Sequence, residues 1–120
     1  MNIAILCMTS PYTFANTETM LQFIDAALNK GHEITGVYLY MDGVINNNRN
    51  ITPSDAEEKN IANLIKEIAE RGVPVSSCPI CAEYRGIKDE TLLIDNTTFE
   101  GLAYLTELVM DSDRLLSFTI

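Results

Sequence analysis

Hydrophobic residues occur along this chain in two patterns, short continuous runs and helical repeats. A continuous apolar run covers residues 3–8 and is typical of a parallel strand that is covered on both faces. After a turn at residues 10–12, apolar residues recur from about Asn16 on one side of a helix that Gly31 ends; they are Met20, Phe23, Ile24, Ala27 and Leu28. The pattern predicts a strand followed by a helix.

A longer polar stretch separates the next strand from the next helix. Residues 34–40 are rich in β-branched and aromatic side chains and predict a second strand. Residues 41–50 are polar, with three successive asparagines, and predict a loop over the surface. Ser54 and Glu57 have the spacing of a capping box, which predicts the start of a second helix that Gly72 ends. Its apolar face consists of Ile61, Leu64, Ile65 and Ile68.

The remaining third of the chain continues this alternation less regularly. Residues 73–77 predict a short third strand. Within residues 82–97 we expect a short helix and a small strand near residues 92–94. Thr98 is a candidate N-cap for a last amphipathic helix, and residues 115–120 predict a final apolar strand. The apolar face of that helix consists of Leu102, Leu105, Leu108 and Val109.

Strands that alternate with helices of this length predict an α/β fold. We expect one domain, residues 1–120, with a Rossmann-like three-layer architecture, a mainly parallel sheet of about five strands and helices on both faces. In such sheets the site lies outside the carboxyl ends of the strands. The segments expected at that edge are residues 9–15, 41–50 and 78–86, where Tyr12, Asp42 and Gly43 would lie on the loops beside the site.

Cys78 is the main candidate for chemistry at that edge. If residues 73–77 form a strand and Pro79 opens a helix, Cys78 takes the N-cap position, where unpaired N–H groups favour a negative group. A thiol there ionises more easily, and the thiolate is the nucleophilic form of cysteine. Arg85 would add a positive charge nearby. The alternative is that Cys78 is an inert packing residue, as buried cysteines often are.

Composition and charge narrow the range of partners and compartments. Eight basic and seventeen acidic residues give a net charge of −9, which would repel a nucleic acid backbone, so we expect no direct nucleic acid partner. No apolar run has the length of a membrane span, and residues 1–8 lack the basic start of a signal peptide. We therefore expect a cytoplasmic protein with reduced thiols and no membrane partner.

Cys78 and Cys81 form a CxxC motif, which is typical of a redox dithiol or of half a zinc site. A zinc site needs about four ligands, and His32 is expected at the opposite edge of the sheet, so we expect no metal. Cys81 is either a resolving thiol for a modified Cys78 or a small buried residue in the first helical turn. Cys7 is expected in the core. The chain has no phosphate-binding glycine motif, and we expect no cofactor.

A series of short motifs follows in order along nearly the whole chain. They are Gln22-Phe23, Gly31-His32-Glu33, Tyr40-Met41-Asp42-Gly43-Val44, Asn46, Thr52-Pro53, Cys78, Arg85-Gly86-Ile87, Asp89-Glu90, Gly101-Leu102, Asp113-Arg114-Leu115 and Phe118. Taken together, in this order and spacing, they resemble the DsrE/TusD family of small sulfur-relay proteins. The resemblance is closest to the branch whose subunits carry the active cysteine, because Cys78 lies seven residues before Arg85-Gly86.

This resemblance implies a cytoplasmic sulfurtransferase that receives sulfur as a persulfide on Cys78 and passes it to a cysteine of a downstream carrier protein. It further implies a homo-oligomer or a hetero-hexamer with related subunits, serving tRNA 2-thiouridine formation or dissimilatory sulfur oxidation. The sequence differs from the family pattern at Pro79 and Cys81, where small apolar residues are usual. Two alternatives stay open: a thiol-disulfide redox protein that uses Cys78 and Cys81, and a non-catalytic subunit of an assembly.

Overall fold

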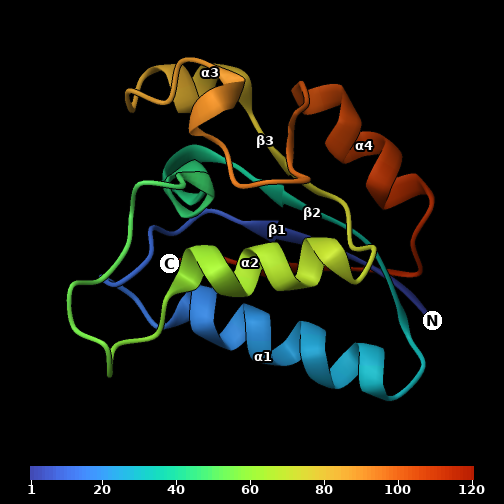
Figure 1. Cartoon of the computed structure of the whole chain (residues 1–120). Coiled ribbons are helices and arrows are strands. Elements are labelled where there is room, and N and C mark those ends of the chain that lie inside the picture. The colour runs from blue at the N-terminus through green and yellow to red at the C-terminus, as the bar shows by residue number, and fades with distance from the viewer.

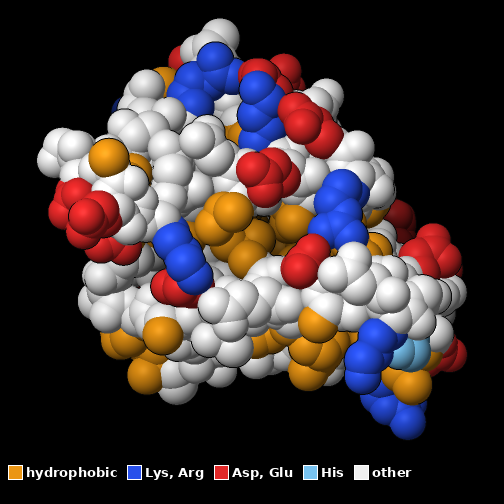
Figure 2. Space-filling model, turned by 60° about the horizontal axis from the view of Figure 1, so that its bottom comes forward, with side chains coloured by type: hydrophobic (Ala, Val, Ile, Leu, Met, Phe, Trp, Pro, Cys, Tyr) orange, Lys and Arg blue, Asp and Glu red, His pale blue; other side chains and the backbone are white.

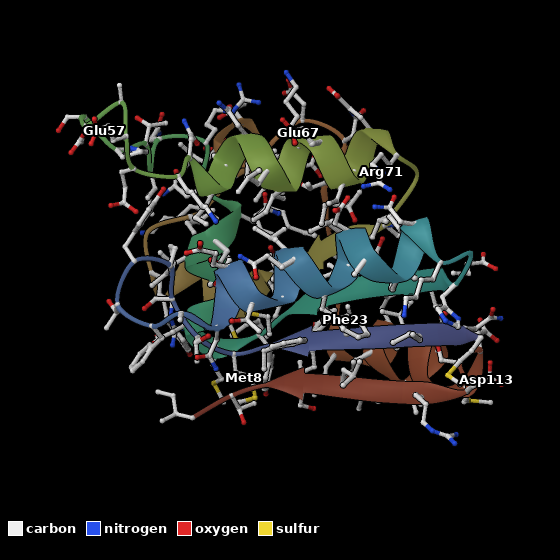
Figure 3. All side chains as sticks on the ribbon, turned by 90° about the horizontal axis from the view of Figure 1, so that it is seen from below. Met8, Phe23, Glu57, Glu67, Arg71 and Asp113 are labelled. Carbon is white, nitrogen blue, oxygen red and sulfur yellow. The ribbon has the colours of Figure 1, made fainter.

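The computed structural model describes residues 1–120 and contains one five-stranded sheet in the order β4-β3-β2-β1-β5. Every neighbouring pair of strands is parallel. The strands are β1 (Asn2–Cys7), β2 (Glu33–Leu39), β3 (Val75–Ser77), β4 (Thr98–Phe99) and β5 (Arg114–Phe118). β5 lies at one edge beside β1, as the view from below shows (Figure 3). The α/β class and the parallel five-stranded sheet predicted from the hydrophobic pattern are confirmed.

The helices cover both faces of this sheet (Figure 1). They are α1 (Asn16–Asn29), α2 (Ile61–Glu70), α3 (Pro79–Glu83) and α4 (Leu102–Met110), with two short 3-10 helices, η1 (Met41–Asn47) and η2 (Glu90–Leu92). α1 and α2 lie side by side on one face, and α3 and α4 lie on the other side of the sheet (Figure 1). None of these helices has the length and apolar character that crossing a membrane requires.

The segment after β2 is not the surface loop that its polarity predicts. Residues 41–47 form η1, and four of its residues are buried: Gly43, Val44, Asn46 and Asn47. The buried asparagines are hydrogen-bonded throughout. Asn46 donates from Nδ2 to the carbonyls of Thr9 and Gly43, at 2.8 and 2.9 Å. Polar side chains that satisfy buried backbone groups are compatible with the core, which is why polarity alone gave the wrong prediction.

Three of the boundaries predicted from capping and strand signals are also wrong. α2 begins at Ile61 rather than near Ser54, because the side chain of Asn60 accepts a hydrogen bond from the Asn63 N–H at 3.1 Å and caps the helix there. Residues 92–94 are not a strand. Thr98 belongs to β4 instead of capping α4, whose N-cap is Gly101. For residues 92–94 and Thr98, hydrogen bonds to distant parts of the chain decide the structure, whereas the start of α2 is decided by its own cap.

Asn47 is buried, and its side chain connects η1 to β3 and to the segment before β4 by hydrogen bonds. Its side chain donates to Ser77 Oγ (3.0 Å) and accepts from the Ile94 N–H (3.1 Å) and Thr97 Oγ1 (3.0 Å). We expect Asn47→Ala to lower the free energy of unfolding by about 2–4 kcal/mol, because it leaves these buried groups without partners. Urea unfolding followed by circular dichroism measures this change.

The matched control is Asn50→Ala, which alters an exposed asparagine three residues away. That change should stay within about 0.5 kcal/mol. Equal effects at the two positions would contradict the role assigned to Asn47.

Candidate functional site

Cys78 lies where the sequence predicts it, between the end of β3 and the start of α3. It is the N-cap residue, with φ −63° and ψ 121°, and Pro79 occupies the first helical turn. The strand-like backbone of Cys78 donates from N–H to the Leu39 carbonyl of β2 (3.0 Å), and its carbonyl accepts from the Ala82 N–H (3.0 Å). The sheet and the helix thus fix this residue from both sides. Only 6% of it is exposed, so it is less accessible than its place on the sheet edge suggests.

The surroundings of Cys78 favour its thiolate. Burial raises the pKa of the thiol, but the Cys81 N–H, the Cys81 thiol, the Ile80 N–H and the Tyr38 hydroxyl lower it, and the net pKa is below the ordinary value. None of the N–H groups makes a side-chain cap hydrogen bond of full geometry to the sulfur. They act through their partial positive charges, as expected at the start of a helix.

Cys81 has the opposite character. Burial raises the pKa of its thiol, the N–H of Met41 lowers it, the neighbouring Cys78 raises it, and Arg85 lowers it; the net pKa is above the ordinary value. Met41 has φ 52°, in the left-handed region that few residues other than glycine adopt, and in this conformation its N–H faces the Cys81 sulfur. The two pKa shifts therefore have opposite directions: Cys78 ionises more readily than a free cysteine and Cys81 less readily.

Arg85 is close to the cysteines, but it is held by other groups. Its Nε donates to Asp42 Oδ1 (2.8 Å) and its Nη1 donates to the Cys81 carbonyl (2.9 Å). The sequence interpretation placed its charge beside Cys78, whereas in the structure it acts on Cys81 and ties α3 to η1. Asp42 thus belongs to the cluster as the partner of Arg85.

Tyr12 and Gly43, the other two residues expected beside the site, have structural contacts of their own. The Tyr12 hydroxyl donates to the Lys59 carbonyl (2.9 Å) and accepts from the Ile61 N–H (3.1 Å), which places it at the start of α2 rather than with the cysteines. Gly43 is packed against the backbone of Cys7, where a Cβ atom would lie 2.0 Å from the carbonyl oxygen. The sheet edge therefore brings together Asp42, Cys78, Cys81 and Arg85.

Tyr38 is a further member of the cluster. It is fully buried in β2, its hydroxyl donates to the Glu100 carbonyl (2.9 Å), and burial followed by the neighbouring Cys78 raises its pKa. Its position directly before Leu39, at the carboxyl end of a central strand, is the one signal in the sequence that points to the site. Its phenol stays protonated. The single O–H proton can be donated either to the Glu100 carbonyl or to the Cys78 sulfur, and the second contact is the one that lowers the pKa of Cys78.

Comparison with known proteins identifies the family. The sequence profile of the DsrE/DsrF-like family matches residues 1–118. The chain belongs to this family. It is 34% identical to a DsrE protein of Allochromatium vinosum named as a candidate sulfurtransferase, with 98% of each protein covered. It is 32% identical to the sulfurtransferase TusD of Salmonella newport, covering 98% of this chain and 100% of that protein.

The family resemblance noted in the sequence is thereby confirmed, and a solved structure supports the fold. The ychN protein from E. coli superposes on this DsrE/DsrF-like chain with a TM-score of 0.87 at 24% identity, covering 98% of this chain and 99% of the other. At that identity the likeness speaks for the fold alone.

Removing the Tyr38 hydroxyl should weaken the ionisation of Cys78 in this DsrE/DsrF-like site. Because that hydroxyl lowers the pKa of Cys78, Tyr38→Phe should raise it, so that less thiolate is present at neutral pH. The rate of alkylation by iodoacetamide as a function of pH should then shift to higher pH. Loss of the hydrogen bond to Glu100 should also cost about 1 kcal/mol of stability.

Tyr40→Phe is the matched control, because Tyr40 is near Tyr38, with ring centroids 6.2 Å apart, but is not among the groups that act on Cys78. An unchanged pH profile in Tyr38→Phe, or an equal shift in both variants, would contradict the role of the hydroxyl.

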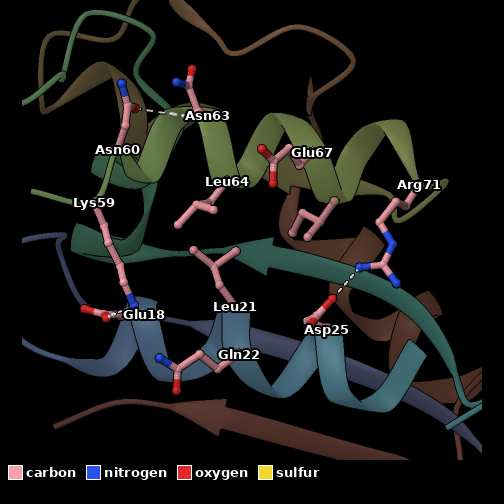
Figure 4. Close-up of a pocket in the computed structure, with 11 residues that line it drawn as sticks. Glu18, Leu21, Gln22, Asp25, Lys59, Asn60, Asn63, Leu64, Glu67 and Arg71 are labelled. Carbon is pink, nitrogen blue, oxygen red and sulfur yellow. Dashed lines mark hydrogen bonds and ion pairs between the residues drawn. The ribbon is translucent and has the colours of Figure 1, made fainter. Parts of the chain in front are cut away.

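This DsrE/DsrF-like chain also has a surface groove away from the cysteines. It lies between α1 and α2, has a volume of about 500 Å³, and carries an ion pair near each end, Lys59 with Glu18 and Arg71 with Asp25 (Figure 4). Figure 2 shows this side of the molecule, with hydrophobic side chains at the bottom of a hollow flanked by charged ones. Cysteines do not line this groove, so the chemistry of the site is independent of it.

Proposed function

We propose that this protein is a sulfurtransferase of a sulfur relay and that Cys78 carries the sulfur as a persulfide. The observation that supports the proposal most directly is Cys78 at the N-cap of α3 with its pKa lowered, in a chain related to proteins named as sulfurtransferases. A thiolate is the form of cysteine that attacks sulfur. A nucleophile of this kind needs a fixed position, and Cys78 has one at the carboxyl end of β3.

The transfer takes place in two displacement steps. The Cys78 thiolate attacks the outer sulfur of a donor persulfide, a new S–S bond forms, the donor S–S bond breaks, and the donor thiolate leaves with the electron pair. In the second step the thiolate of an acceptor cysteine attacks the outer sulfur on Cys78 and releases the Cys78 thiolate. Sulfur moves without net oxidation, and neither step uses a metal or an organic cofactor.

Burial of Cys78 affects how the partners reach it. Only 6% of the residue is exposed in the single chain, so a donor must present its persulfide closely to this edge. Once loaded, the outer sulfur lies about 2 Å beyond Sγ, the length of an S–S bond, and is the atom offered to the acceptor. The small exposed fraction of Cys78 favours a partner protein whose surface matches this edge.

The partners we propose are a persulfide donor protein and a small protein with an acceptor cysteine, both in the cytoplasm, in tRNA 2-thiouridine formation or dissimilatory sulfur metabolism. We also propose an oligomer, a homo-oligomer or a hetero-hexamer of related subunits. α4 supports this, because Leu108 is its only buried residue while Leu102, Val109 and Met110 are exposed. Apolar surface of this kind is typical of subunit interfaces.

Sulfur loading tests the proposal. The reduced protein is incubated with glutathione persulfide, desalted and analysed by intact mass spectrometry and peptide mapping under non-reducing conditions. We expect one added sulfur atom on the peptide that contains Cys78, and its loss when a thiol acceptor protein is added. Absence of added sulfur with no sulfide released, or sulfur found on Cys7 in place of Cys78, would overturn the proposal.

A further inference from the structure

Cys81 takes no part in the two displacement steps, yet the fold holds it against Cys78. Cys78 is the N-cap residue and Cys81 is the third residue of α3. In the first turn of a helix, the N-cap side chain faces the backbone of this third residue, whose own side chain reaches back toward the N-cap. Residues at this spacing have Cβ atoms about 5–6 Å apart. A disulfide needs about 3.5–4.5 Å, so a small adjustment of this turn is enough to join the two sulfurs.

The surroundings of Cys81 fix this arrangement and shield it. Arg85 donates to the Cys81 carbonyl (2.9 Å) and to Asp42 (2.8 Å), which ties the turn to η1. Cys81 is 7% exposed and Cys78 is 6% exposed. A persulfide on Cys78 therefore has the Cys81 thiol beside it, while thiols in solution must first reach a covered site. Such proximity makes attack by the Cys81 thiol much faster than attack by a thiol from solution.

We propose that Cys81 discharges the sulfur from Cys78 when no acceptor protein takes it. This inference rests on the proposed function, because it concerns what becomes of the Cys78 persulfide. The Cys81 thiolate attacks Sγ of Cys78 and forms a Cys78–Cys81 disulfide. The bond between Sγ and the outer sulfur breaks, and the outer sulfur leaves with the electron pair, takes up a proton and departs as hydrosulfide.

Electrons balance within this step without an external oxidant. The outer sulfur is reduced to the level of sulfide by two electrons, and the two cysteines are oxidised to the disulfide. The disulfide cannot accept sulfur, so the protein stays inactive until a dithiol reductant opens it by exchange. Cys81 would thus convert an unused relay protein into a resting form instead of leaving a reactive persulfide in place.

The charges around Cys81 support this order of events. In the unloaded protein, burial and the neighbouring Cys78 raise the pKa of Cys81, while the Met41 N–H and Arg85 lower it. The Met41 N–H and Arg85 thus stabilise the Cys81 thiolate that attacks Sγ. The attack follows the arrival of sulfur, because only a loaded Cys78 has a bond to an outer sulfur that can break.

A comparison of wild type with Cys81→Ser tests the inference. Both proteins are loaded with glutathione persulfide, desalted and kept without acceptor, while intact mass and released sulfide are followed over time. We expect wild type to release one equivalent of sulfide and to end two hydrogen masses below the reduced protein. Cys81→Ser should keep its added sulfur at least about ten times longer, because the internal attacking group is gone.

Cys7→Ser is the control, because Cys7 lies at the end of β1, where its Sγ contacts the Thr9 carbonyl at 3.7 Å, and should behave as wild type. Equal persulfide lifetimes in wild type and Cys81→Ser would overturn the inference and leave the proposed function standing. Transfer of the added sulfur to Cys81 without sulfide release would also overturn it. If neither protein takes up sulfur, the proposed function itself fails, and the discharge step fails with it.

Discussion

Replacing Cys78 by serine is expected to abolish sulfur loading while the protein stays folded. A serine hydroxyl does not ionise near neutral pH, so the lowered pKa that the site gives to the Cys78 thiol has no counterpart in the variant. Loss of the nucleophile should reduce the rate of loading by at least about a thousandfold, the order found when other enzymes lose theirs. Mass spectrometry after incubation with glutathione persulfide measures the remaining uptake.

Stability separates this loss from a folding defect. Serine is a preferred N-cap residue, and Cys78 occupies the N-cap of α3, so Cys78→Ser should unfold within about 1 kcal/mol of wild type. Cys7→Ser is the matched variant, because Cys7 is a buried cysteine at the end of β1, outside this cluster, and should load sulfur as wild type does. Normal loading of Cys78→Ser, or loss of loading in both variants, would exclude Cys78 as the carrier.

Much of this site follows from short sequence signals. Adjacent residues predict the strand-to-helix junction around Pro79, because an apolar strand is followed by a proline at the first helical turn. In the structure Cys78 is the N-cap of that helix. The parallel sheet follows from strands that alternate with amphipathic helices, and it brings η1 and α3 together at one edge. These features depend on local pattern and on general topology.

Other features depend on pairings between distant residues, which a single sequence does not state. Asn46 and Asn47 were interpreted as loop residues because they are polar, but they are buried because their partners, among them Thr9 and Ser77, come from other strands and turns. Arg85 was placed beside Cys78 from its distance along the chain, whereas Asp42 of η1 decides where its guanidinium lies.

Gly43 links these distant pairings to the site, and Gly43→Ala is expected to be severely destabilising. A Cβ atom at this position would lie 2.0 Å from the Cys7 carbonyl oxygen and 2.8 Å from its carbonyl carbon. These are backbone atoms of the central strand β1, which cannot move aside as the end of a side chain can. The expected cost is about 4 kcal/mol or more, a large share of the roughly 5–15 kcal/mol that stabilises a typical domain. Thermal and urea unfolding measure it.

The contact, rather than backbone conformation, is the cause, because Gly43 is not among the glycines with positive φ. Gly101→Ala is therefore the informative control: Gly101 caps α4 with φ −66° and has no atom within 4 Å of a Cβ placed there. That variant should lose at most about 1 kcal/mol of stability.

Gly43 lets η1 lie directly on β1, and η1 carries Met41 and Asp42. In a folded Gly43→Ala protein, Cys81 should therefore also be alkylated faster than in wild type. Unchanged stability in Gly43→Ala would show that η1 can move away from β1 without cost. The close contact between η1 and β1 would then not be what holds η1 against the cysteines.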